Sequence, residues 1–460
     1  MMNKLFSVLL FGFLLGIFGG GISPALGANT DGNLADLSIQ QAIANALAKN
    51  PMLEMAAAQA EAARNRTAQA RSGFFPQVDL NGSWNRTTNP MWAFGTKLNQ
   101  GQITQMDFAP DRLNDPDPIN NFGANVSLRW ALYNGGQIRA GRDQALLGEK
   151  IAVLGLARAR QQVIAQTATV YAGLLMAGEN LNVIKQALKT ARTSLKMVQS
   201  RYNSGVAIKS DLLRAQVRIA KLAQLQTLAE SHVETAWAGL AATMGTLAND
   251  RYRLTSSLET AQKLEDSLST WIVSALHHRP DLEQVRYQVQ IAGKAVQKAH
   301  GAHLPSVGLF GKYEIDTEDF NDSADNYMFG AGVRLNLFSG FRYTAGEKEA
   351  RAMLAAAKAR EYQTTLGIRV ETESAFQQAR SAFESIEVSS VAISQAEEAL
   401  RIIRNRYQNG MMTIVGLLDA EVALQQARTN HFNRLHDYKV AMIRLMLAAG
   451  TIDQKVSDLL

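Results

Sequence analysis

Short segments in which every second residue is apolar occur at four places along the chain. From Phe122 to Leu132, phenylalanine, alanine, valine, leucine and tryptophan alternate with glycine, asparagine, serine and arginine. Successive side chains of a β-strand point to opposite faces, so this pattern predicts a strand with one apolar and one polar face. Its length suits a tilted strand that crosses a bilayer, which needs about 9–11 residues. We predict two hairpins, made of strands at about 77–87 with 122–133 and about 306–315 with 327–338.

The polar faces of these strands are expected to line the interior of a membrane barrel, and the apolar faces are expected to contact outer-membrane lipid. The lumen-facing residues predicted by the alternation are Asn125, Ser127, Arg129, Lys312, Arg334 and Asn336. An ordinary soluble sheet with one buried face is the alternative. The rest of the chain offers no second layer for such a sheet, because its long helical segments have apolar seams of their own.

Longer segments repeat apolar or small residues with alternating spacings of four and three. One such seam runs from Val163 to Tyr202, and a second runs from Ile368 to Tyr407. This heptad pattern indicates left-handed coiled coils, and no proline interrupts residues 119–279 or 306–460. We predict helices at about 139–203, 206–247, 341–408 and 414–448, paired as antiparallel hairpins.

The chain carries a two-fold internal repeat of helix, strand, strand, helix and helix. The motif that begins at Arg201 recurs 205 residues later, whereas Pro51 and Pro76 recur as Pro280 and Pro305, 229 residues later. The two offsets differ by 24 residues, which lie between Pro76 and Phe122 of the first copy. We predict a first repeat at 28–248 and a second at 249–460, which opens with an equatorial segment at about 249–279.

The amino terminus and the composition restrict the class of protein. A basic residue, Lys4, precedes an apolar run that ends in glycines, and small residues follow, as in a secretory signal peptide at 1–27. The net charge of +6 is scattered along the chain, which gives no support for a nucleic-acid partner. The chain has 0 cysteines, which removes disulfides, thiolate metal sites and a lipid-modified cysteine. No cofactor or metal is expected.

Four membrane strands in one chain cannot remain an open sheet in lipid, because the edge strands would leave backbone groups unpaired. Membrane barrels close at about eight strands or more. Several copies of the chain are therefore expected to pool their strands.

The junction and tip motifs resemble those of the TolC family of outer-membrane efflux and secretion channels. The resemblance rests on the stretch from Leu132 to Gly136, on Arg-Tyr-x-x-Gly at two helix ends, and on the Leu-Leu-x-Ala that follows each end. It implies a mostly α fold with a membrane β portion: a homotrimer whose four strands per chain form a 12-stranded outer-membrane β-barrel, continued by a long α-helical coiled-coil barrel in the periplasm of a Gram-negative bacterium. The implied function is the exit duct of a tripartite efflux pump or type I secretion system, with a periplasmic adaptor and an inner-membrane transporter as partners.

The resemblance also implies two sets of functional residues. The adaptor-contacting tips would comprise Arg201, Tyr202, Gly205, Asp211, Arg406, Tyr407 and Gly410. The periplasmic gate would use Asp419, while Gly416 stands where the family often has a second acid and Met412 where it can have a basic residue. The gate would then have one ring of Asp419 carboxylates and would be held closed less firmly.

Two other classes of protein remain as alternatives. An enzyme would need a catalytic cluster, and the histidine pairs of this chain, such as His300 and His303, lack the spacing of a metalloprotease motif. No catalytic residue is therefore predicted. A periplasmic coiled-coil structural or adaptor protein would explain the heptads, but it would not need four strands of membrane length.

Overall fold

The computed structural model describes residues 35–246, 251–258, 263–264 and 266–456, and its helices and strands belong to the compact unit Asp36–Leu460. The predicted signal peptide at 1–27 lies outside the described residues. That segment and the division of the chain into two repeats stay predictions.

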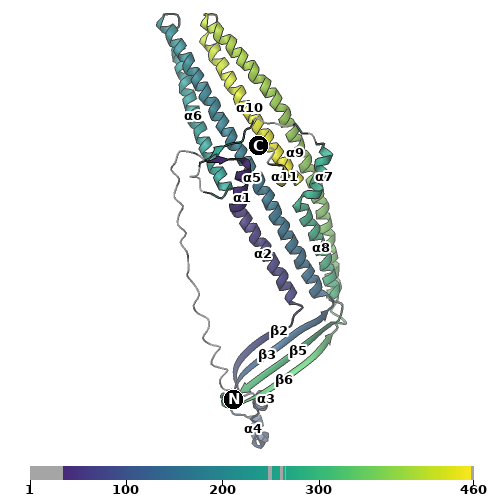
Figure 1. The fold of residues 1–460 in the computed structure, drawn as a ribbon. Coiled ribbons are helices and arrows are strands. Elements are labelled where there is room, and N and C mark those ends of the chain that lie inside the picture. Colours follow the sequence, from purple (N-terminus) through teal and green to yellow (C-terminus); the bar gives the residue numbers. More distant parts are fainter. Residues whose placement is uncertain (1–34, 247–250, 259–262, 265, 457–460) are drawn as a thin grey trace. The chain divides into compact units, whose positions relative to one another are not determined.

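Four long helices form two antiparallel hairpins (Figure 1). Helix α5 (Gln137–Asn203) returns through α6 (Lys209–Thr243), and α9 (Arg342–Gln408) returns through α10 (Ile414–Ala449). Both α5 and α9 contain 67 residues. The heptad seams face the packed side, where Val163, Leu174 and Leu188 are buried in α5. None of the described helices combines the length and apolar character needed to span a membrane.

Helix α6 is shorter than the expected segment at 206–247. Gly205 adopts a left-handed conformation with φ of +76°, and the N–H group of Val206 donates to the carbonyl of Arg201 over 2.8 Å. This hydrogen bond completes the end of α5. Residues 206–208 therefore belong to the connection, and the return helix begins at Lys209.

Shorter helices precede each strand pair in the same order. Helices α1 (Ile39–Lys49) and α2 (Pro51–Ser72) have 11 and 22 residues, as have α7 (Leu268–His278) and α8 (Pro280–Gly301). Proline at the first helical position, with its φ already suited to a helix, starts both α2 and α8. Helix α2 packs on α5, and α8 packs on both α5 and α9.

The segment expected to be equatorial contains α7 and a short strand, β4 (Arg253–Leu254). Strand β4 pairs in parallel with β1 (Asp36–Leu37), and the side chain of Arg253 bonds to Asp36 over 2.7 Å. This pairing was not expected, because a two-residue strand carries no alternation that a sequence pattern can detect.

The main sheet has the order β2-β3-β5-β6, and every neighbouring pair is antiparallel. Its strands are β2 (Gln77–Thr87), β3 (Ile119–Asn134), β5 (Ser306–Thr317) and β6 (Ser323–Arg334). Strands β2 and β6 are the two edges, and each is paired on one side only.

The strand expected at 327–338 begins earlier and ends earlier. Thr317 pairs with Ser323, so the turn spans only 318–322, and Arg334 pairs with Ser306, the first residue of β5. Residues after Arg334 have no strand opposite them, and β6 ends there. Asn336 therefore lies outside the strands, and its expected place on the polar face stays a prediction.

A bulge near the end of β3 interrupts the alternation of faces along the strand. The register against β5 shifts between Ala131 and Tyr133, and Tyr133 pairs with Val307. Val307 belongs to the apolar face, so Tyr133 lies on that face and not on the polar one. Bulges depend on the partner strand, which is why alternation within β3 did not reveal it.

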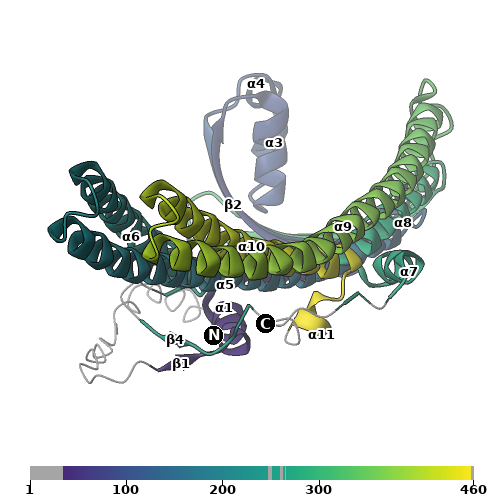
Figure 2. The same ribbon diagram turned by 90° about the horizontal axis from the view of Figure 1, so that it is seen from above.

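The connection between β2 and β3 is folded. It contains α3 (Pro90–Asn99), a 3₁₀ turn η1 (Gln105–Phe108) and α4 (Pro110–Asn114). Seen along the long helices, the ribbon forms an arc, with α3 and α4 on the concave side and β1, β4 and α11 (Ile452–Lys455) on the convex side (Figure 2).

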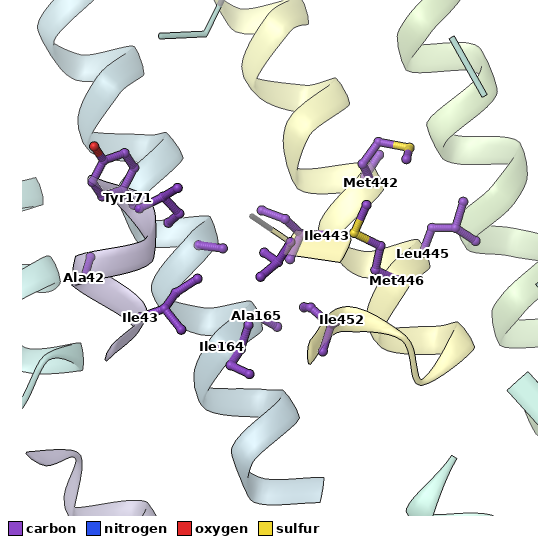
Figure 3. Close-up of a cluster of buried hydrophobic side chains, with 14 of the residues drawn as sticks. Ala42, Ile43, Ile164, Ala165, Tyr171, Met442, Ile443, Leu445, Met446 and Ile452 are labelled. Atoms are coloured by element: carbon purple, nitrogen blue, oxygen red, sulfur yellow. The ribbon is translucent and has the colours of Figure 1, made fainter. Parts of the chain in front are cut away.

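The largest apolar core lies where α1, α5, α10 and α11 converge (Figure 3). Ile43, Ile164 and Ile443 belong to its buried side chains. The hydroxyl group of Tyr171, which is fully buried, donates to the carbonyl of Leu37 over 2.8 Å. Burial of a side chain of this size contributes about 1.5–3 kcal/mol, so this core holds the middle of the helices together.

Candidate functional site

The sheet has one polar face, and five of the six predicted lumen residues lie on it. Register places Ser127 opposite Lys312 and Arg334 opposite Ser306. The amide of Asn81 donates to Asn125 over 3.2 Å, and Arg129 pairs with Asp79 over 2.8 Å. The residues of the predicted set on this face are Asn125, Ser127, Arg129, Lys312 and Arg334.

The opposite face of the sheet is apolar and open. Leu80, Trp84, Phe329 and Val333 are each more than half exposed. Large exposed apolar surfaces mark contacts with a protein or a membrane. This sheet therefore presents an apolar surface on one side and a charged, amide-rich surface on the other.

At the far end of the long helices, the two hairpin tips are joined by Arg201. Its guanidinium group donates to the carbonyls of Tyr407 and Gln408 over 2.5 and 3.2 Å, and it lies 5.1 Å from the centre of the Tyr407 ring. The last carbonyls of a helix lack intrahelical partners and favour cations. Arg201, at the end of α5, therefore completes the end of α9.

The repeated tip motif is used in two different ways. Tyr407 is 4% exposed, whereas its counterpart Tyr202 is 37% exposed. Arg406, the counterpart of Arg201, is exposed. Tyr202 and Arg406 are therefore exposed at the tips, whereas the Tyr407 side chain is buried between the hairpins. Asp211 lies in the first turn of α6, and Gly205 and Gly410 both adopt left-handed conformations.

Two of the three predicted gate residues lie against each other. A Cβ atom placed on Gly416 would lie 2.9 Å from the sulfur of Met412, so the Met412 side chain occupies the space beside Gly416. The hydroxyl group of Thr413 accepts a hydrogen bond from the Gly416 N–H group over 3.4 Å, which caps α10. Asp419 is exposed, one turn further along α10.

A polar contact between the hairpins was not detected in the sequence. Ser194 of α5 donates to Glu421 of α10 over 2.5 Å, and Arg218 of α6 donates to Gln425 over 2.6 Å. Glu421 is 6% exposed. Burial raises the pKa of its carboxyl group, while Ser194, Arg404 and Arg218 oppose that rise. The heptad positions gave no signal for it, because this contact depends on how two hairpins meet.

His300 and His303, the pair weighed as a metal site, lie in an ordinary ionic cluster. His300 and His303 lie 3.2 and 3.8 Å from the same carboxylate oxygen of Glu347, which also pairs with Arg351. Within the described ranges, no group of three histidine, aspartate or glutamate side chains is arranged to hold a metal.

Comparison with known proteins assigns the chain to a family. The family described as outer membrane efflux protein matches residues 42–246 and 271–451, which together are most of the chain. The chain belongs to the outer membrane efflux protein family. Its relatives and structural neighbours are named as outer membrane proteins and outer membrane channels. The resemblance seen in the tip and junction motifs is thereby confirmed.

The relatives are distant in sequence, and two of them match over most of their own length. The outer membrane protein TolC of Vibrio cholerae is 23% identical over 95% of this chain and 96% of its own length. The alkaline protease secretion protein AprF of Pseudomonas aeruginosa is 24% identical over 89% of this chain and 83% of its own length. The outer membrane channel CmeC of Campylobacter jejuni has a TM-score of 0.76 at 17% identity, with 97% of each chain covered. The fold is that of the outer membrane efflux family.

Proposed function

We propose that this chain is the outer-membrane exit duct of a tripartite efflux pump or a type I secretion system. Three copies would close a 12-stranded barrel, and their long helices would continue it as a tunnel across the periplasm. Substrates would reach the tunnel from an inner-membrane transporter through a periplasmic adaptor. Drugs, metal ions and polypeptides are all compatible cargoes, because a water-filled duct is selective mainly by size and charge.

The observation that carries the proposal is a four-stranded sheet with two unpaired edges and two chemically different faces. Strands β2 and β6 have no partner on their outer sides within the described unit. In a bilayer these backbone groups need partners, and the edges of neighbouring copies can supply them. The apolar face would then contact lipid, and the face with Asn125, Arg129 and Lys312 would line the lumen.

The helical end would hold the adaptor site and the gate. Exposed Arg406 and Tyr202, with the turns at Gly205 and Gly410, are available to an adaptor. Three Asp419 side chains brought to one axis would make a ring of negative charge. Because the two neighbouring gate positions are Gly416 and Met412, the proposed gate would have no second acidic ring and no basic residue to hold it closed.

Membrane fractionation tests the proposal. The protein should sediment with the outer membrane and migrate as a trimer in mild detergent gels, and heating should convert it to a single-chain band. Purified trimers should form ion-conducting channels in planar bilayers. A soluble periplasmic monomer would overturn the proposal and would favour the structural or adaptor protein.

A further inference from the structure

The segment that connects β2 and β3 lies over the polar face of the sheet. Trp92 and Asn99 of α3 share an open cavity of about 560 Å³ with Asn125, Lys312 and Glu314, all of which belong to that face. Figure 2 shows α3 and α4 on the concave side of the arc. The segment Pro90–Asn114, here called the inner segment, therefore stands on the side of the sheet that is proposed to line the lumen.

Buried polar side chains hold the inner segment in this position. The amide of Gln100, just after α3, donates to the carbonyl of Asn120 and to the side chain of Asn121, both over 2.8 Å. Asn121 in turn donates to Asp316 of β5 over 2.7 Å. All three side chains are at least nine-tenths buried. Buried hydrogen bonds of this kind are costly to break, because each leaves an unsatisfied polar group.

An internal ion pair gives the segment its own shape. Lys97 donates to Asp107 over 2.8 Å, and Asp107 also accepts from the backbone and hydroxyl groups of Thr104. The hydrogen bond from Lys97 and, to a smaller extent, those from Thr104 hold the pKa of the Asp107 carboxyl group well below its usual range. The inner segment is therefore held in shape by its own hydrogen bonds and is fixed to the sheet through Gln100.

The inner segment carries a group of exposed large apolar side chains. They are Met91, Trp92, Leu98, Met106 and Phe108, each more than half exposed. Such a group in a water-filled lumen calls for a partner. The unpaired edges of β2 and β6 suit a second copy of this chain as that partner. If copies join at these edges, their concave sides face a common axis. The inner segments of the copies then approach one another.

We propose that the inner segments of three copies meet inside the barrel and form a constriction near its outer mouth. The hairpin connections lie at the sheet end opposite the long helices, which places them at the external side. The second repeat has only a short turn at 318–322, so the constriction has three parts and not six. This inference rests on the proposed trimeric duct.

Cysteine crosslinking tests the meeting of copies, because the chain has 0 cysteines of its own. In the assembled channel, Trp92→Cys and Met91→Cys should form crosslinked dimers on oxidation or with a short bismaleimide. Val126→Cys is the matched control: it lies in β3 near the same level but on the apolar face, and it should stay single. Trp92→Cys and Met91→Cys chains that both stay single in an assembled trimer would overturn the proposal.

Labelling from outside the cell tests the constriction. Asn125→Cys, beneath α3, should be protected from a large polyethylene glycol maleimide and should react with a small charged maleimide. Replacing residues 90–114 by a short Gly-Ser linker in the same variant should remove the protection. Equal labelling by the large reagent in both chains would contradict the constriction.

A cysteine at Asn321, in the turn between β5 and β6, separates this inference from the proposed function. It should react with both reagents from outside, with or without the inner segment. If it does not react, the hairpins are not at the external side, and the duct itself is placed wrongly. If it reacts and Asn125→Cys is equally open to the large reagent, only the constriction fails.

Discussion

Single residues on the two faces of β3 should respond in opposite ways to the same substitution. Leu128→Arg would place a charge on the face proposed to contact lipid, at a cost of about 2–4 kcal/mol near mid-bilayer. We expect loss of trimer from the outer-membrane fraction. Asn125→Arg, on the polar face beside Asn81, should assemble and alter conductance. Equal tolerance of both variants would show that the assignment of the two faces is wrong.

Asp419 is the residue proposed to give the gate its charge. Asp419→Asn should weaken cation selectivity and reduce block by multivalent cations applied from the periplasmic side, because the ring of carboxylates would be lost. Recordings of single trimers in planar bilayers measure both quantities. Unchanged selectivity and block would leave Asp419 as a solvated acid favoured by the start of α10.

Glu421 should make the stability of the tips depend on pH. Burial raises the pKa of the Glu421 carboxyl group in the folded state. The contribution of this group to folding stability is therefore complete below its pKa in the unfolded chain, about 4.3. That contribution is lost as the pH rises through the folded-state pKa. Glu421→Gln keeps the size and a polar contact for Ser194. It should stabilise the trimer at neutral pH by on the order of 1 kcal/mol, with a smaller gain near the unfolded pKa.

Thermal unfolding midpoints at several pH values measure this difference. Glu387→Gln is the matched control, since it makes the same substitution at an exposed glutamate of α9 and should not reproduce the gain. A gain from Glu421→Gln that is the same at every pH would show that the Glu421 carboxyl group does not carry it.

At the scale of elements, the two strand-to-helix junctions provide a matched pair of glycines. Gly135 and Gly340 both have left-handed backbone conformations, with φ of +65° and +62°. A Cβ atom on Gly135 would lie 2.1 Å from the carbonyl oxygen of Gly301. A Cβ atom on Gly340 would meet nothing within 4 Å. Gly340→Ala should cost about 1–2 kcal/mol from the left-handed conformation alone. Gly135→Ala should cost more, because α8 must also move.

The amount of folded trimer recovered from outer membranes and its thermal midpoint measure the two costs. Similar losses for the two variants would show that the contact with Gly301 does not limit the junction.

The elements differ in how far sequence could predict them. Alternation located the strands, and heptads located the long helices, since both patterns arise from residues close in the chain. The end of β6 at Arg334 and the bulge before Tyr133 depend on the partner strand, so no pattern within one strand could reveal them. The inward fold of 90–114 depends on Gln100 reaching Asn121, which a loop rich in proline and asparagine did not indicate.

For the candidate site, the sequence located the tip motifs and five positions on the polar face of the sheet, but it treated the two copies of the tip as equivalent. Packing makes them different: Arg201 bonds to the end of α9, and Tyr407 becomes buried. The contact between Ser194 and Glu421 was likewise beyond prediction, because those residues lie on different hairpins.

At the scale of the whole molecule, the tips should be open to an adaptor in the assembled duct. Cysteines at Ser204 and Asn409, which follow α5 and α9 directly, should crosslink to a periplasmic adaptor in cells. A cysteine at Asn321 should not. Crosslinks from Asn321 alone would reverse the proposed orientation of the chain in the envelope.

The difference between Tyr202 and Tyr407 also implies an order of events in assembly. Arg201 and Tyr407 belong to one chain, so their contact forms in a first-order step whose rate is independent of protein concentration. Tyr202 can lose its exposure only when another molecule arrives, in a step whose rate rises with concentration. Absorbance of the phenol in two matched variants, one that keeps only Tyr407 and one that keeps only Tyr202, would therefore time folding and association separately.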